Sequence, residues 1–217
     1  MNFVYFCGWL GFRIFFRVGF RCRAFNVARV PDRGPVILAA NHASFFDPPL
    51  VGSCLDRSIN YLARESLFRF PGLGWLLRQW DSVPVDRDGG GAAGLRAIFD
   101  RLQAGGAILL FPEGTRTNDG QLLPARSGLG LVVIKSTAPV VPVRVFGTYE
   151  AYGRHMKFPV PRAVRVKIGR PMDFTTLRAE ARQCSKPRLK AIYQQVANEI
   201  MAEIGRLQPC EDKTSFG

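Results

Sequence analysis

Strand-like and helix-like patterns of apolar residues alternate along most of the chain. Short apolar runs bounded by turn residues predict strands at about residues 36–40, 59–63, 82–85, 107–111, 140–146 and 164–168. Apolar residues that recur every three or four positions predict helices at about residues 48–56, 72–80, 92–104, 126–136 and 188–207. Strands that alternate with helices are typical of an α/β fold. We therefore expect a single domain with a mostly parallel central sheet flanked by helices.

The first 25 residues have a different pattern, rich in aromatic residues and free of acidic ones. Arg13, Arg17 and Arg21 recur every four residues, so a helix would gather them on one side and leave the other side apolar. The uninterrupted apolar run, 3–12, is shorter than the roughly 20 residues that cross a bilayer. The positive charges follow this run instead of preceding it, which argues against a signal peptide.

This pattern predicts an amphipathic interfacial membrane anchor over residues 1–28, with its arginines among the lipid headgroups. The alternative is an amphipathic helix packed on the core of its own domain. Residues 29–207 would then form the α/β domain, and the polar tail 208–217 would fray.

Composition and charge limit the classes of molecule that we expect this protein to bind. A chain of 217 residues that is 47% hydrophobic is long enough for one domain with its own core. Its formal net charge of +13 favours anionic partners: nucleic acid, an acidic membrane surface or a phosphorylated substrate. We expect no nucleic-acid partner, because no recognition module is present and the aromatic residues cluster in the apolar first segment. The five scattered cysteines contain no Cys-x-x-Cys pair, which favours reduced thiols over a zinc site or a disulfide framework.

A run with the composition of a catalytic site, Asn-His-Ala-Ser-Phe-Phe-Asp, occupies residues 41–47 directly after the predicted strand 36–40. In an α/β sheet, such a position lies at the carboxyl edge, where ligands bind. The imidazole of His42 is suited to take a proton near neutral pH. A carboxylate such as that of Asp47 fixes the tautomer of the imidazole and stabilises the imidazolium that forms.

The spacing of five residues between His42 and Asp47 is too long for one helical face. We expect Pro48 and Pro49 to keep Asp47 out of helical geometry, so that the pair meets across a bent loop. The alternative is a turn at the start of a helix, with Asn41 or Ser44 as a cap and a structural histidine.

A second polar turn follows the predicted strand 107–111 and reads Pro-Glu-Gly-Thr-Arg over residues 112–116. Backbone N–H groups at such a turn, together with Arg116, would form an anion site, because a guanidinium matches phosphate oxygens. The alternative is a surface turn with an ion pair between Glu113 and Arg116.

Together the two runs resemble the glycerolipid acyltransferase family, the 1-acylglycerol-3-phosphate O-acyltransferases. That family is marked by an Asn-His-x-x-x-x-Asp block and a Phe-Pro-Glu-Gly-Thr-Arg block, and both are present here. Weaker blocks at 74–87 and 138–143 occur in the same order, and the resemblance covers about residues 30–175. One departure is Ala-Arg-Ser-Gly at 125–128, where Phe-Lys-x-Gly is more usual, although Arg126 keeps the positive charge.

The resemblance implies transfer of a fatty acyl group to the 2-hydroxyl of 1-acylglycerol 3-phosphate, which gives phosphatidic acid. The donor would be a thioester of acyl carrier protein or coenzyme A, and no other cofactor and no metal is implied. His42 would act as the general base and Asp47 would orient it. The sequence has no Gly-x-Ser-x-Gly nucleophile elbow, so the hydroxyl would attack directly, without an acyl-enzyme.

The same resemblance implies a phosphate-binding set. Arg87 and Arg116, helped by the turn at Gly114 and Thr115, would hold the phosphate of the acceptor. Glu113 would position Arg116 or a glycerol hydroxyl. Binding the phosphate would also align the acceptor hydroxyl with the base.

Alternatives remain at this stage. The acceptor could be glycerol 3-phosphate or a lyso-ornithine lipid. The chain could also be a basic peripheral membrane-binding protein without turnover, although intact His42 and Asp47 argue against that. We expect a peripheral, monotopic enzyme of phospholipid biosynthesis on an anionic surface at the cytoplasmic face of the cell membrane.

Overall fold

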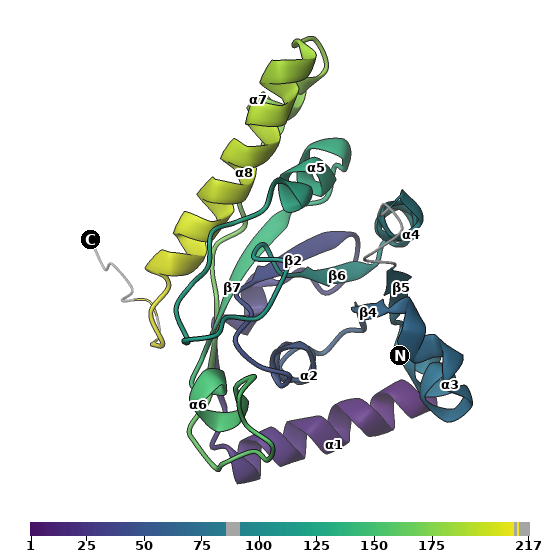
Figure 1. The fold of residues 1–217 in the computed structure, drawn as a ribbon, viewed down its shortest axis with the longest axis vertical. Helices are drawn as coiled ribbons and strands as arrows, with labels where there is room; N and C mark the ends of the chain where they lie inside the picture. The colour runs from purple at the N-terminus through teal and green to yellow at the C-terminus, as the bar shows by residue number, and fades with distance from the viewer. Residues whose placement is uncertain (86–91, 211, 213–217) are drawn as a thin grey trace.

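The computed structural model describes residues 1–85, 92–210 and 212 (Figure 1). Its strands are β1 (Arg23–Phe25), β2 (Val36–Ala40), β3 (Ile59–Asn60), β4 (Leu62–Arg64), β5 (Val83–Val85), β6 (Ala107–Leu110), β7 (Val140–Phe146) and β8 (Arg165–Ile168). Its α-helices are α1 (Phe3–Gly19), α2 (Asp47–Ser53), α3 (Pro71–Gln79), α4 (Ala92–Gln103), α5 (Ser127–Lys135), α6 (Thr148–Tyr152), α7 (Thr175–Ala181) and α8 (Lys186–Arg206). Two short 3₁₀ helices, η1 (Val27–Arg29) and η2 (Glu65–Arg69), complete the set.

A six-stranded sheet forms the centre of the fold, in the order β1-β8-β7-β2-β6-β3. All neighbouring strands in it run parallel except β7 and β8, which are antiparallel. The register places Leu38 of β2 opposite Leu109 of β6 and Val141 of β7. The prediction of an α/β domain with a mostly parallel central sheet is therefore confirmed.

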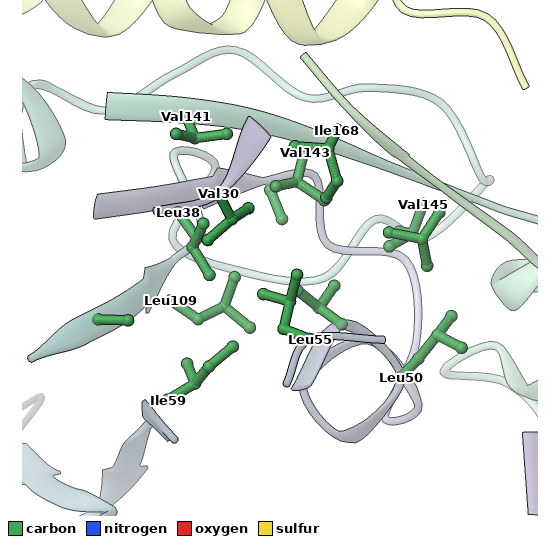
Figure 2. Packing of buried hydrophobic residues seen from close by; sticks show 14 of the residues in the cluster. Val30, Leu38, Leu50, Leu55, Ile59, Leu109, Val141, Val143, Val145 and Ile168 are labelled. Carbon is green, nitrogen blue, oxygen red and sulfur yellow. The ribbon is translucent and has the colours of Figure 1, made fainter. Parts of the chain in front are cut away.

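Helices cover both faces of this sheet, which explains why every residue of β2 is buried (Figure 1). Leu38 packs in a cluster that includes Leu50 of α2 and Leu55 just beyond it (Figure 2). Its neighbour Ile37 packs on the opposite face, in a cluster that includes residues of α5 and α8. The helix α1 lies outside α2 and forms a further layer (Figure 1).

Two predicted strands differ in detail from the structure. The run expected as one strand at 59–63 divides at Tyr61 into β3, in the central sheet, and β4, outside it. β4 pairs with β5 in a separate parallel sheet of two strands, so the strand predicted at 82–85 lies outside the central sheet. Periodicity identifies extended residues but not their partners, which depend on contacts distant in sequence.

The expectation that Asp47 lies outside helical geometry is wrong, because α2 begins at this residue. Pro48 and Pro49 occupy the first turn of the helix, where backbone N–H groups have no intrahelical partner and proline is tolerated. The loop that precedes Asp47 still bends back on itself, so that His42 reaches the Asp47 side chain.

α1 packs on the domain along one side, as the alternative to an anchor predicts, and the membrane anchor itself stays a prediction. Tyr5 and Phe16 are buried against the domain, and the Trp9 indole donates a hydrogen bond of 2.8 Å to the Leu55 carbonyl. The opposite side is exposed and apolar, with Ile14 at 55% and Val18 at 76%. No helix within the described ranges has the length and apolar character needed to span a bilayer.

The residues that follow α8 make specific contacts. The ammonium group of Lys167, a buried side chain of β8, donates to the Cys210 carbonyl at 2.5 Å and to the Asp212 carboxylate at 2.6 Å. Arg29 donates to the same carboxylate. These bonds hold the described part of the tail against β8 and η1, and the boundaries expected at 28 and 207 stay predictions.

Candidate active site

The loop between β2 and α2 brings His42 and Asp47 together. His42 Nδ1 lies 2.8 Å from Asp47 Oδ2, and the same oxygen accepts the backbone N–H groups of Ala43 and Ser44, each at 2.7 Å. The Asp47 side chain is fully buried, whereas that of His42 is 16% exposed. The carboxylate therefore makes Nδ1 the proton-bearing nitrogen and leaves Nε2 to accept a proton.

Two other residues of this loop fix its position. The Asn41 side-chain amide accepts from Val145 N at 2.8 Å and donates to Val145 O at 3.3 Å, so it continues the pairing of β2 with β7. Ser44 Oγ donates to Tyr152 O at 2.6 Å and ties the loop to α6. Neither residue caps α2, since its N-cap position is Phe46, which makes no side-chain cap.

The second motif turn, after β6, holds the backbone of His42 from two sides. Glu113 Oε1 accepts from His42 N at 3.0 Å, and Thr117 N donates to His42 O at 2.9 Å. The other Glu113 oxygen accepts from Leu123 N at 3.4 Å. The role expected for Glu113 was contact with Arg116 or a glycerol hydroxyl, whereas both of its oxygens accept backbone N–H groups of the site.

Burial raises the pKa of the Glu113 carboxyl group. Its side chain is 2% exposed, and removal from water raises its pKa from 4.5 to about 7. The hydrogen bonds from His42 N and Leu123 N favour the charged form and lower the pKa, but the nearby Asp47 carboxylate raises it again. Burial therefore favours the neutral form of Glu113 well above the pH at which an exposed glutamate ionises.

A pocket of about 220 Å³ opens at the His42 ring. The ring stacks on Phe111 with centroids 3.9 Å apart and planes 14° from parallel. Gly114 also lines the pocket, in the left-handed conformation (φ 67°) that closes the turn with a 3.0 Å bond from its N–H to Phe111 O. A reacting group in this pocket would meet an imidazole held in one orientation.

Two arginines lie beside these turns. The Arg116 guanidinium sits over the Phe45 ring, 3.4 Å from its centroid, and Phe45 belongs to the His42 loop. Arg126 packs across Gly114, where a Cβ would lie 2.9 Å from Arg126 Cδ. Thr115 is partly buried in the same turn. Arg87, expected to share the phosphate, lies outside the described residues.

A second pocket, of about 340 Å³, adjoins the first and shares three lining residues with it, Pro48, Tyr61 and Leu62. Its other walls come from α1, α2, η2, the C-terminal end of α3 and the residues around β4, and they are mostly apolar. Tyr61 reaches this position because residue 52 is glycine, where a Cβ would lie only 1.8 Å from the Tyr61 hydroxyl. The site thus joins an imidazole, a basic turn and an apolar pocket.

Comparison with known proteins identifies the class of protein that this fold and site define. A family model described as Acyltransferase matches residues 22–146, more than half of the 217-residue chain and inclusive of both motif turns. The chain therefore belongs to the acyltransferase family.

The names of similar proteins are more specific than the description of the family. The chain is 31% identical over 116 residues to the chloroplastic 1-acyl-sn-glycerol-3-phosphate acyltransferase BAT2 of Brassica napus, a match that covers 52% of this chain and 33% of that protein. It is 27% identical over 126 residues to the 1-acyl-sn-glycerol-3-phosphate acyltransferase of Bacillus subtilis, covering 58% of this chain and 62% of that protein. The matches therefore span less than two thirds of the length of these relatives.

A solved structure is similar over nearly the whole chain. The 1-acyl-sn-glycerophosphate (LPA) acyltransferase PlsC from Thermotoga maritima has a TM-score of 0.70 and 25% sequence identity, and the match covers 94% of this chain and 79% of that one. The fold predicted from the sequence is therefore shared with an acyltransferase.

Proposed function

We propose that this protein transfers a fatty acyl group from an acyl thioester to the 2-hydroxyl of 1-acylglycerol 3-phosphate, which gives phosphatidic acid. The observation that carries the proposal is the His42–Asp47 pair, 2.8 Å apart, in a pocket that adjoins an apolar one. The names of the similar proteins from Brassica, Bacillus and Thermotoga support the same acceptor.

In this proposal, His42 Nε2 removes the proton of the acceptor hydroxyl as its oxygen attacks the thioester carbonyl. The buried Asp47 carboxylate stabilises the imidazolium that forms. Collapse of the tetrahedral intermediate breaks the carbon–sulfur bond, and the thiol leaves with the proton that His42 carried. Glu113 and Thr117 act through the backbone of His42 and keep its ring in place.

The acceptor phosphate would bind at the basic turn. Arg116 supplies a guanidinium next to the His42 loop, and Arg126 adds a second positive charge over Gly114. Arg87 remains in the proposed set on the strength of its motif. A phosphate held there would place the glycerol hydroxyl near the imidazole and reduce the entropic cost of reaction.

The apolar pocket would receive an acyl chain. Its walls include Tyr5 and Trp9 of α1 and Pro49 of α2, so α1 contributes directly to the site. The exposed apolar side of α1 would lie in the lipid interface, which lets a lipid substrate reach the pocket from the membrane. We place this surface at the cytoplasmic face of the membrane, where we expect acyl thioesters and reduced cysteines.

Thiol release with a panel of acceptors tests the proposal. Purified protein in detergent is given acyl-coenzyme A or acyl carrier protein thioesters, with 1-acylglycerol 3-phosphate, glycerol 3-phosphate, a lyso-ornithine lipid or no acceptor. We expect release that requires 1-acylglycerol 3-phosphate, with phosphatidic acid as the product. Release that requires another acceptor would overturn the acceptor assignment. A complete lack of release would overturn the proposed reaction.

A further inference from the structure

Two of the five cysteines touch each other at the seam between α1 and the domain. Cys22 lies in the short connection between α1 and β1, and Cys54 is the C-cap residue of α2. Their sulfur atoms are 4.0 Å apart, although 32 positions separate them in sequence. A disulfide needs sulfur atoms about 2.05 Å apart, so closure requires a shift of about 2 Å. The backbone N–H of Cys22 donates to Phe16 O at 3.0 Å, so closure would come from rotation of the two side chains and a small shift of this connection.

The pair is also accessible. Both thiols line a pocket of about 440 Å³, whose walls include Arg13, Arg17 and Arg23. This pocket is the route by which a small polar oxidant would approach the pair. Both residues are partly buried and pack against the core beneath α1.

The surroundings of the two thiols differ in a way that suits stepwise oxidation. The hydrogen bond with Cys54 and the positive charge of Arg17 lower the pKa of Cys22, although partial burial opposes them. The hydrogen bond with Cys22 and burial raise the pKa of Cys54. Arg17 favours a thiolate at Cys22 and burial disfavours one at Cys54, so we assign the first oxidation to Cys22.

We propose that Cys22 and Cys54 form an oxidisable dithiol that closes into a disulfide and latches the end of α1 to the end of α2. With hydrogen peroxide as the oxidant, the Cys22 thiolate attacks one oxygen, the oxygen–oxygen bond breaks, and hydroxide leaves. Cys54 then attacks the resulting sulfenic acid, a sulfur–sulfur bond forms, and water leaves. Overall, two thiols and one peroxide give one disulfide and two waters.

The disulfide would join two helices that line the candidate site. α1 and α2 both line the 340 Å³ apolar pocket, and α2 begins at Asp47. A bond between Cys22 and Cys54 would prevent α1 from separating from α2 without reduction. The redox state of the surroundings would then determine whether α1 can separate from α2.

The test uses the full chain with Cys7, Cys184 and Cys210 replaced by serine, so that only the pair remains. After a small excess of hydrogen peroxide, we expect the intact mass to fall by two hydrogen atoms and both thiols to resist alkylation, until dithiothreitol restores them. Cys22→Ser in the same background should form no intramolecular bond. Cys54→Ser should leave a sulfenic acid on Cys22 that dimedone traps.

Limited proteolysis then tests the latch itself. Release of the α1 segment should slow in the oxidised protein and recover after reduction. Two alkylatable thiols after oxidation, or oxygen added to each sulfur without a bond, would overturn the dithiol. A bond that leaves the proteolysis of α1 unchanged would overturn the latch. Neither result depends on the acyl-transfer reaction.

Discussion

At the scale of single residues, the site is one imidazole with little freedom to move. Asp47 and Phe111 contact the ring of His42, while Glu113 and Thr117 bond its backbone N–H and C=O. The motif letters and their spacing were sufficient to predict the pairing of His42 with Asp47. They did not indicate Thr117, because its contribution is a backbone N–H group, which any residue type could supply.

Arg116→Ala tests the phosphate site. If the guanidinium binds the acceptor phosphate, its loss should raise KM for 1-acylglycerol 3-phosphate about tenfold or more, because a charged hydrogen bond contributes about 1.5–3 kcal/mol. KM for the thioester should change little. Steady-state kinetics with each substrate varied in turn measures the difference, and Arg182→Ala, an exposed arginine, controls for lost charge. Equal increases in the two KM values would contradict the assignment.

Glu113→Gln tests the buried carboxyl. Because burial raises its folded pKa from 4.5 to about 7, its contribution to the free energy of unfolding is intact below pH 4.5 and declines as pH rises to 7. The full decline is about 3 kcal/mol. Urea unfolding at several pH values should show this slope in the native protein and lack it in Glu113→Gln. If the free energy of unfolding changed with pH equally in the two proteins, the pKa of Glu113 would not be raised.

At the scale of elements, α5 and α8 pack closely on one face of the sheet (Figure 1). Gly130 of α5 makes this possible, because a Cβ there would lie 1.8 Å from the Tyr193 carbonyl of α8. The contact joins two backbones, so no side-chain rotation can relieve an added methyl group. A glycine inside a predicted helix gives no indication of this from sequence, since its partner lies in another helix.

Gly130→Ala should therefore force α5 away from α8 and cost about 1–3 kcal/mol of stability. Gly128→Ala on the same helix is the matched control, since a Cβ at Gly128 meets nothing within 4 Å. That change should be neutral or stabilise by up to about 1 kcal/mol. Denaturant midpoints measure both, and equal effects of the two substitutions would be inconsistent with this packing.

The sequence predicted the long elements of the fold but not the shortest strand and helices. β2 and β7 match their predicted bounds, because long apolar runs buried on both faces give a clear signal. β1, α6 and α7 were not predicted; they span three, five and seven residues. Segments this short carry too little periodicity to stand out, and contacts with the rest of the molecule stabilise them.

At the scale of the whole molecule, α1 is a layer with two apolar sides. One side packs on α2, and the other exposes Leu10, Ile14 and Val18. The sequence predicted an amphipathic helix with a charged side, but aromatic and aliphatic residues surround much of its circumference. The open apolar side is the surface that we propose contacts lipid.

Replacing Leu10, Ile14 and Val18 together by serine should weaken binding to anionic vesicles at least about tenfold, because each buried aliphatic side chain contributes about 1.5–3 kcal/mol. Sedimentation with vesicles measures the change. The packed side of α1 is untouched, so the thermal midpoint should stay close to that of the native protein. Unchanged sedimentation would show that this side of α1 does not contact lipid.

The role of His42 as general base is the central claim, and the rate of thiol release by His42→Ala tests it most directly. With saturating thioester and 1-acylglycerol 3-phosphate, we predict a loss on the order of 10²–10⁴-fold in kcat. His155→Ala, which removes the only other histidine, an exposed one, should keep the native rate. A folded His42→Ala protein that releases thiol as fast as the native enzyme would contradict the account.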